Sequence, residues 1–114
     1  RYVPYSPGKL FSEIGKFYRK FNRYGEAIFW YEKAINEEPD VFANWWGLGR
    51  ARMGMAEELI KQKKDIHAEK MLNRALKELE TALEKSPRPL QLPASRDLPD
   101  QIAKCKKLYL LYKY

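Results

Sequence analysis

Few side chains in this chain of 114 residues have the type and spacing that chemistry needs. The stretch GLGRARMG, residues 47–54, superficially resembles a glycine-rich phosphate loop. A dinucleotide fingerprint needs a third glycine at position 52 and a preceding strand, whereas Arg52 stands there inside a pattern of helical period. We therefore expect helix packing, rather than phosphate binding, to explain Gly49.

The other reactive side chains do not form a catalytic or metal-binding set. The chain has one cysteine, Cys105, and one histidine, His67, so it cannot assemble a Cys/His zinc site. We expect Cys105 to be a small buried apolar residue and His67 to lie on a helix surface. Acidic pairs such as Glu57–Glu58 fall on polar faces, whereas catalytic carboxylates need a shielded pocket. The sequence thus predicts a protein that is not an enzyme, with no catalytic residues, no metal and no cofactor.

Composition and charge restrict the class further. Apolar residues make up 45% of the chain, as in globular proteins, and no apolar run exceeds five residues, so no membrane span is expected in this segment. The net charge of +7 permits an acidic peptide, a membrane surface or a nucleic acid as partner without selecting one. The chain begins at Arg1, so a signal or an anchor outside the segment stays open, and the cytoplasm is the expected location.

Apolar residues recur at helical spacing almost throughout, and five helices are expected. The first set is Leu10, Ile14, Phe17, Tyr18 and Phe21. Three more sets follow, separated by NRYG, NEEPD and IKQKKDIH. A proline-rich connector over residues 88–98 then precedes a last helix over residues 99–114, with Asp97 as its cap.

The sequence contains an internal repeat with two different offsets. Phe11, Ile14 and Gly15 recur 34 residues later, as Trp45, Leu48 and Gly49. Ala27, Tyr31, Ala34 and Pro39 recur 48 residues later, as Ala75, Leu79, Ala82 and Pro87. An offset of 34 residues is the period of one class of helical repeat, a hairpin of two helices.

With these residues in register, residues 8–87 resemble the tetratricopeptide repeat family. The resemblance implies an all-α fold, a right-handed superhelical stack of antiparallel helix hairpins. Residues 8–41 would form the first repeat and residues 42–87 the second, closed by residues 99–114 as a capping helix. Gly15, Ala27 and Ala34 would let helices approach closely, so most aromatic residues would serve packing. The second copy departs from the family at Arg52, where an aromatic residue is usual.

The difference between the two offsets places 14 additional residues inside the second repeat. Shared between two helices, they lengthen each by about two turns and keep the buried stripe in phase. The second hairpin should then project roughly 10 Å beyond the first. Its turn should lie near residues 62–65 with Asp65 as the cap, and its tip should carry Lys61, Lys63 and Lys64.

In the resembled family the first helices of successive repeats line a concave groove. By alignment, the groove candidates here are Lys9, Ser12, Lys16, Arg19, Lys20, Ala43, Trp46, Arg50 and Met53. Trp46 follows an inward-facing Trp45, so it either anchors a peptide in the groove or packs against the closing helix. The asparagines with which some members clamp a carboxylate terminus are absent.

The sequence therefore predicts a protein–protein interaction module that binds a peptide or protein with acidic and apolar groups through the groove, and through the basic tip as a second surface. One alternative is a basic helical repeat that binds nucleic acid, although no base-reading pattern is visible. Another is a structural subunit docked permanently in a larger assembly. Self-association stays open, because an uncovered end of such a stack is apolar.

Overall fold

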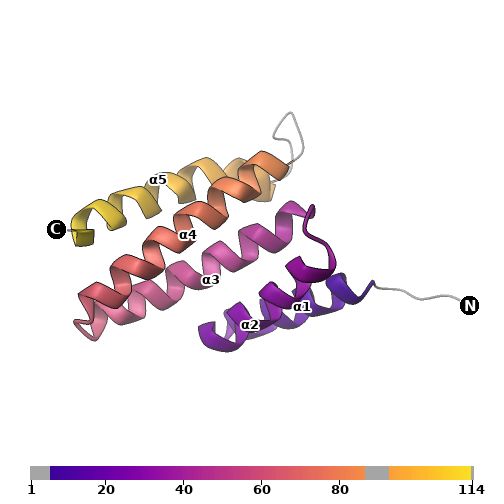
Figure 1. Cartoon of the computed structure of the whole chain (residues 1–114), viewed down its shortest axis with the longest axis horizontal. Coiled ribbons are helices and arrows are strands. Elements are labelled where there is room, and N and C mark those ends of the chain that lie inside the picture. The colour runs from indigo at the N-terminus through magenta and orange to yellow at the C-terminus, as the bar shows by residue number, and fades with distance from the viewer. Residues whose placement is uncertain (1–5, 87–92, 114) are drawn as a thin grey trace, which may run out of the picture.

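A computed structural model of the protein describes residues 6–86 and 93–113, and within them it contains five α-helices and no strand. The helices are α1 (Pro7–Lys20), α2 (Tyr24–Glu37), α3 (Phe42–Lys61), α4 (Asp65–Lys85) and α5 (Pro93–Lys113). Each packs on the next in the chain, and α1 also contacts α3 (Figure 1). The predicted all-α class and the five helices are confirmed.

Local sequence signals explain where the first helix begins and ends. The Ser6 side chain accepts a hydrogen bond from the Lys9 backbone N–H at 3.2 Å, and Pro7 occupies a first-turn position that needs no N–H partner. Asn22, with φ of 61°, reverses the chain after α1 in a left-handed conformation that asparagine tolerates well. Lys63, with φ of 59°, makes the equivalent reversal after α3.

The second hairpin is longer than the first, as the repeat offsets predict. Helices α3 and α4 have 20 and 21 residues, whereas α1 and α2 have 14 each. The extra residues add about 10 Å, and the hairpin extends beyond α1 and α2 in Figure 1. The turn lies between Lys61 and Asp65, as predicted. The predicted cap is wrong by one residue, because α4 begins at Asp65 and Lys64 occupies the cap position.

The boundary predicted for the last helix is wrong. Helix α5 begins at Pro93, so residues 93–98 are helical rather than part of a connector, and Asp97 lies inside the helix. Proline is well suited to the first helical position, and the early start places Leu98, which is fully buried, on the face that packs on α4. Pro99 is therefore inside the helix. The predictions for Pro87, residues 88–92 and Tyr114 lie outside the described residues.

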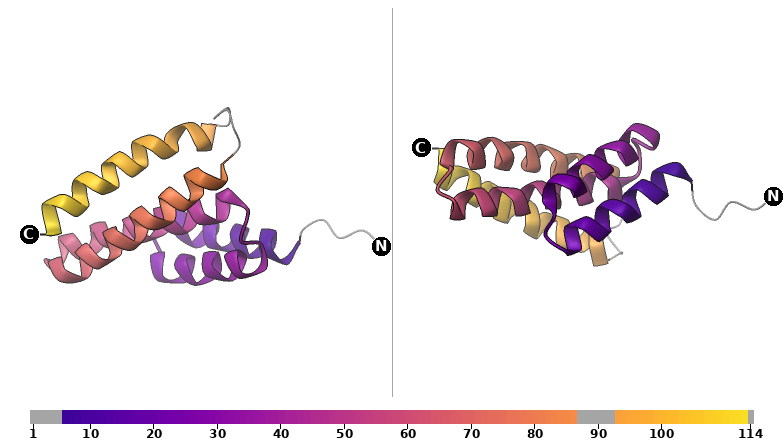
Figure 2. Two further views of the ribbon diagram at one scale, coloured as in Figure 1. Left: turned by 45° about the horizontal axis from the view of Figure 1, so that its top comes forward. Right: turned by 90° about the horizontal axis from the view of Figure 1, so that it is seen from below.

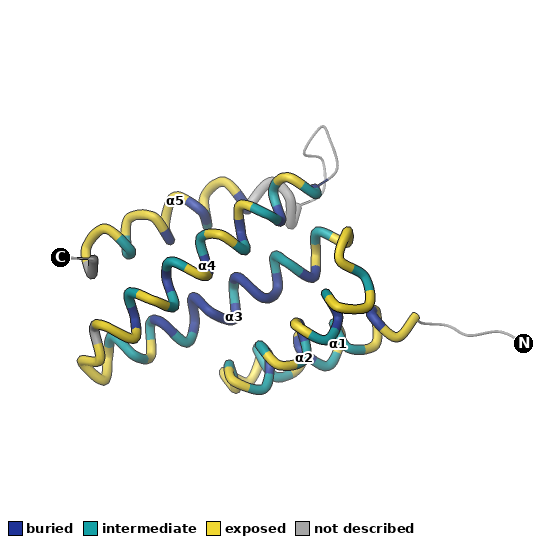
Figure 3. Tube along the Cα trace, in the orientation of Figure 1, coloured by how far each residue is buried: buried dark blue, intermediate teal, exposed yellow. Residues whose placement is uncertain are grey.

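Small residues on α3 allow its neighbours to approach closely. Helix α3 is the most continuously buried element of the trace, and its dark blue segments run along most of its length (Figure 3). A Cβ added to Gly49 would lie 2.7 Å from Leu79 Cγ, so packing explains this glycine, as expected. A Cβ on Gly47 would lie 2.3 Å from the Tyr31 ring, and sequence reasoning missed this contact. A Cβ on Gly15 would lie 3.1 Å from the Tyr31 ring, which agrees with the close helix approach expected at this glycine.

The core has two parts. One lies between α3, α4 and α5, and the other joins α2 to α3. The buried members of the larger part are Met53, Ala56, Leu72, Ala75, Leu79, Ala82, Leu98, Ile102 and Cys105. Those of the smaller part are Ala27, Tyr31, Leu48 and Ala51. Helices α2 to α5 thus supply the buried core residues.

The apolar set of the first helix behaves differently. Leu10, Phe17 and Phe21 expose 49%, 57% and 62% of their surfaces, while the fully buried positions of α1 are Gly8 and Gly15. Gly15 faces the Tyr31 ring of α2, which would lie 3.1 Å from an added Cβ, whereas Gly8 lies against the Glu38 side chain. The apolar stripe of α1 therefore points outward.

Candidate functional site

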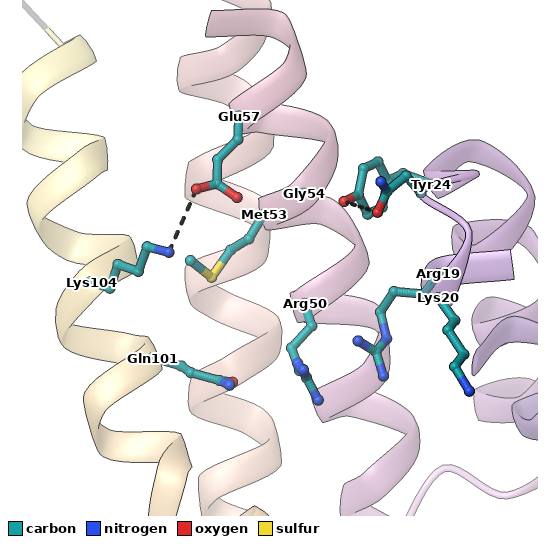
Figure 4. Close-up of a pocket in the computed structure, with 10 residues that line it drawn as sticks. Arg19, Lys20, Tyr24, Arg50, Met53, Gly54, Glu57, Gln101 and Lys104 are labelled. Carbon is teal, nitrogen blue, oxygen red and sulfur yellow. Dashed lines mark hydrogen bonds and ion pairs between the residues drawn. The ribbon is translucent and has the colours of Figure 1, made fainter. Parts of the chain in front are cut away.

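A hollow of about 400 Å³ lies where α1, α3 and α5 face one another. Its lining residues are Arg19, Lys20, Asn22, Tyr24, Arg50, Met53, Gly54, Glu57, Gln101 and Lys104 (Figure 4). In the view of Figure 2 from below, α1, α3 and α5 follow one another along one side of the molecule and α2 and α4 lie on the other. The hollow thus belongs to the side formed by the first, third and fifth helices.

Two arginines from different helices converge on this hollow. Arg19 comes from the last turn of α1 and Arg50 from the middle of α3, and Figure 4 shows Arg50 between Arg19 and Gln101 of α5. The Arg19 Nε donates to the Tyr31 hydroxyl at 3.5 Å, so the Arg19 side chain reaches from α1 to α2. The Arg50 guanidinium lies 4.5 Å from the centre of the Trp46 ring.

Trp46 lies beside Arg50 and contacts the closing helix, but it is not among the residues that line the hollow. Its indole Nε1 donates to Gln101 Oε1 at 2.6 Å, and its ring packs against the larger core. Of the two roles considered for Trp46, packing against the closing helix is the one observed. A peptide in the hollow would therefore meet Arg50 and Gln101 before it met the indole ring.

The charges around the hollow are mainly positive. Arg19, Lys20, Arg50 and Lys104 line it, against the single acid Glu57. Lys104 Nζ lies 3.5 Å from Glu57 Oε2. Within the described part of the chain, Arg19 and Lys20 make no ion pair. The hollow therefore presents an excess of positive charge to solvent.

Tyr24 adds a neutral hydrogen-bonding group at the α1–α3 edge. Burial raises the pKa of its phenol, and the charges of Glu58 and Glu57 raise it further. Its hydroxyl donates to Asn22 Oδ1 at 2.9 Å, and its ring leaves no space for a Cβ on Gly54. The phenol is therefore un-ionised at neutral pH and borders the cationic surface.

The structure brings together only part of the predicted groove set. Arg19, Lys20, Arg50 and Met53 line the hollow, although Met53 is 6% exposed and belongs mainly to the core. The predicted residues Lys9, Ser12, Lys16 and Ala43 do not line it. Lys9 is instead exposed and pairs with Glu13 at 3.4 Å. Ser12 is half-buried, and Lys16 and Ala43 are exposed.

Sequence reasoning missed the contribution of α5. Gln101 and Lys104 line the hollow from this helix. They lie beside its buried face, which comprises Leu98, Ile102 and Cys105. A helical projection of α5 would have identified them once its buried face was assigned.

The predicted basic tip is exposed at the far end of the second hairpin. Lys61, Lys63 and Lys64 all face solvent. Lys63 and Lys64 line a second, shallow hollow with Ile66 and His67. The tip and the α1–α3–α5 hollow are thus separate surfaces, and His67 is exposed, as expected.

The cysteine and the possible metal ligands do not form a reactive site among the described residues. Cys105 is buried, its Sγ donates to the Leu72 carbonyl at 3.3 Å, and burial raises the pKa of the thiol to about 11. Among the described residues, no group of His, Cys, Asp and Glu side chains is placed to hold a metal ion. None of the helices in residues 6–86 and 93–113 is both long and apolar enough to cross a membrane.

Comparison with known proteins places the chain in no family. No protein-family model matches it, and neither curated proteins nor solved structures give a significant match.

Proposed function

We propose that the protein is a non-catalytic protein–protein interaction module that binds an acidic peptide segment in the hollow between α1, α3 and α5. The architecture that accompanies this proposal is a tetratricopeptide-like stack of two hairpins closed by α5. Its support is the order of the helices: the hollow is lined by the first helix of each hairpin and by the closing helix.

The observation that carries the proposal is the set of four cations that three helices direct to one hollow, opposed by one carboxylate. Arg19 and Lys20 form no ion pair within the described residues. An arginine can bind a carboxylate with two parallel hydrogen bonds, which gives directional recognition of glutamate and aspartate side chains.

The exposed lysines at the hairpin tip are proposed as a second contact for the same partner. The second hairpin projects about 10 Å beyond the first, because its helices are six and seven residues longer, and a partner that extends past the hollow along α3 would reach the tip. Contacts from exposed lysines raise the association rate more than the lifetime of a complex.

The test is fluorescence anisotropy with a labelled extended peptide of glutamate, leucine and proline. We expect Arg19→Glu/Lys20→Glu to weaken binding at least about tenfold, because each lost charge-assisted contact costs roughly 1.5–3 kcal/mol. Lys63→Glu/Lys64→Glu should reduce mainly the association rate. The matched control is Lys106→Glu/Lys107→Glu, the same charge change on exposed residues of α5, which should leave the affinity within about twofold.

A labelled single-stranded oligonucleotide distinguishes the nucleic-acid alternative. Nucleic-acid binding falls steeply as salt rises from about 50 to 200 mM, whereas a peptide contact that neutralises fewer charges falls less. Tighter binding of the oligonucleotide than of the peptide would contradict the proposal. So would an equal loss of peptide affinity in Arg19→Glu/Lys20→Glu and in the control Lys106→Glu/Lys107→Glu. Absence of peptide binding by a chain that associates with itself would favour a permanently docked subunit.

A further inference from the structure

The outward stripe of α1 is a second surface with properties of its own. Leu10, Phe17 and Phe21, which we call the α1 stripe, are spaced by seven and four residues and therefore lie on one side of the helix. The rings of Phe17 and Phe21 are 5.0 Å apart, centre to centre. A hollow of about 320 Å³ is lined by Phe17, Tyr18, Phe21 and Arg23.

The fold does not need these large side chains. The inward side of α1 is occupied by Gly8 and Gly15, and the stripe is not part of either core cluster. Large apolar side chains exposed together on one helix are disfavoured in water, and such a patch is a mark of an interaction surface. The α1 stripe extends over about 16 Å, the rise of three helical turns, which matches the apolar face of a partner helix.

The charge beside the stripe restricts what can bind there. Residues 7–23 contain five basic residues and one acid. Lys20 follows Phe17 by three residues and makes no ion pair within the described part of the chain. Arg23 borders the hollow, pairs with Glu26 and lies 5.9 Å from the Tyr18 ring centre. An occupant of the stripe therefore meets a positive border.

We propose that the α1 stripe is a docking surface for an acidic amphipathic α-helix of a partner protein. The apolar face of that helix would cover Leu10, Phe17 and Phe21, and its glutamates or aspartates would face Lys20 and Arg23. A second copy of this chain is disfavoured as the occupant, because two α1 helices would bring their basic borders together. Lys20 borders both this surface and the α1–α3–α5 hollow, but Phe17 and Phe21 do not line that hollow, so variants at these two positions test this proposal separately.

The experiment uses a fluorescein-labelled peptide of about 18 residues, five helical turns, with leucine at helical spacing and glutamate on its polar face. A second peptide carries lysine in place of every glutamate. Anisotropy is measured against the full chain, Phe17→Ser/Phe21→Ser, and the charge-reversal control Lys106→Glu/Lys107→Glu on α5. The matched control Ile66→Ser removes an apolar side chain that is 71% exposed in the first turn of α4.

We expect the glutamate peptide to bind at least tenfold more tightly than the lysine peptide. Phe17→Ser/Phe21→Ser should abolish this binding without loss of helical circular dichroism, whereas Ile66→Ser and Lys106→Glu/Lys107→Glu should bind within about twofold of the parent chain. Equal affinity for both peptides, absence of binding, or equal loss in the Ile66 control would overturn the proposal. So would a dimer in sedimentation analysis that Phe17→Ser/Phe21→Ser converts to monomer, because the occupant would then be a second copy.

Discussion

Replacement of Arg52 by methionine is the perturbation whose energetic cost the structure predicts most directly. Only 6% of the Arg52 side chain is exposed, and its Nε donates to the two Glu78 carboxylate oxygens at 2.9 and 2.6 Å. Its Nη2 donates to Glu32 at 2.8 Å. One guanidinium thus connects α2, α3 and α4. Removal of one partner of a buried ion pair costs about 3–5 kcal/mol, because the other charge stays buried without compensation.

Glu78 is the charge that Arg52→Met leaves behind. Its side chain is 13% exposed, whereas that of Glu32 is 53% exposed and can return to water. We therefore expect Arg52→Met to lower the free energy of unfolding by about 3–5 kcal/mol at pH 7.5. The double variant Arg52→Met/Glu78→Met should be more stable than Arg52→Met alone, since it also removes the uncompensated charge. Urea denaturation followed by circular dichroism measures both values.

The pH dependence gives an independent check. Burial raises the pKa of Glu78, and the charge of Arg52 partly offsets this rise. The pKa of Glu78 is about 4.5 in the unfolded chain and higher in the folded protein. Between these two values the folded protein binds more protons than the unfolded chain, so the free energy of unfolding falls as the pH rises through this window. Loss of Arg52 should extend the window upward. The cost of Arg52→Met should consequently be smaller at pH 5 than at pH 7.5.

Two results would refute this reasoning. If Arg52→Met lowered the free energy of unfolding by less than about 1 kcal/mol, the Arg52–Glu78 pair would contribute no more than an exposed ion pair does. A cost that is the same at both pH values would show that desolvation of Glu78 does not determine it.

Three further predictions concern the packing around the site. Gly47→Ala should destabilise the fold by about 1–3 kcal/mol, because its Cβ would lie 2.3 Å from the buried Tyr31 ring. Gly25→Ala should be neutral or slightly stabilising, because the nearest atom to its Cβ would be 3.8 Å away. Thermal denaturation compares the two variants. Cys105, with a pKa of about 11, should react with a thiol reagent at pH 8 roughly a hundredfold more slowly than in the urea-unfolded chain, and equal rates would show that the thiol is accessible. Gln101→Ala should cost about 1–3 kcal/mol in denaturant titration, because the Trp46 indole donor would lose its acceptor at 2.6 Å; an unchanged midpoint would mean that water replaces the amide.

The sequence allowed the helices and the long hairpin to be predicted because their signals are local or periodic. Small residues at repeated positions, Gly49 among them, indicated close helix packing, and the extra residues between Gly49 and Ala75 indicated the projecting hairpin. The start of α5 could not be predicted from local signals. Proline content favoured a connector, whereas burial of Leu98 against α4 accompanies a helix that starts at Pro93.

The candidate site was predictable only in part. Alignment with a repeat pattern identified Arg19, Arg50 and Trp46, but it could not show that Trp46 bonds to a residue 55 positions away in the chain. The same limit applies to Arg52. Its partners lie 20 and 26 residues away on other helices, and no spacing within one helix indicates such a pairing. Long-range polar contacts depend on how helices are placed, which periodicity alone leaves undetermined.

The central claim is that the α1–α3–α5 hollow binds acidic peptide segments. The three tryptophan indoles report on different surfaces. Trp46 contacts Arg50 and Gln101 at the hollow, Trp45 donates to the Pro39 carbonyl near the α2–α3 turn, and Trp30 lies against Phe11 and Phe29 on the first hairpin. Their indole N–H signals in ¹H–¹⁵N NMR spectra can therefore locate a bound peptide directly.

The most direct measurement is a titration of the ¹⁵N-labelled chain with the extended glutamate, leucine and proline peptide. We predict that the Trp46 indole signal shifts progressively and saturates, while the Trp45 and Trp30 signals stay in place. Movement of the Trp30 signal alone would place the peptide on the first hairpin, and movement of the Trp45 signal alone would place it at the α2–α3 turn. Either result, or three unchanged signals, would contradict the claim.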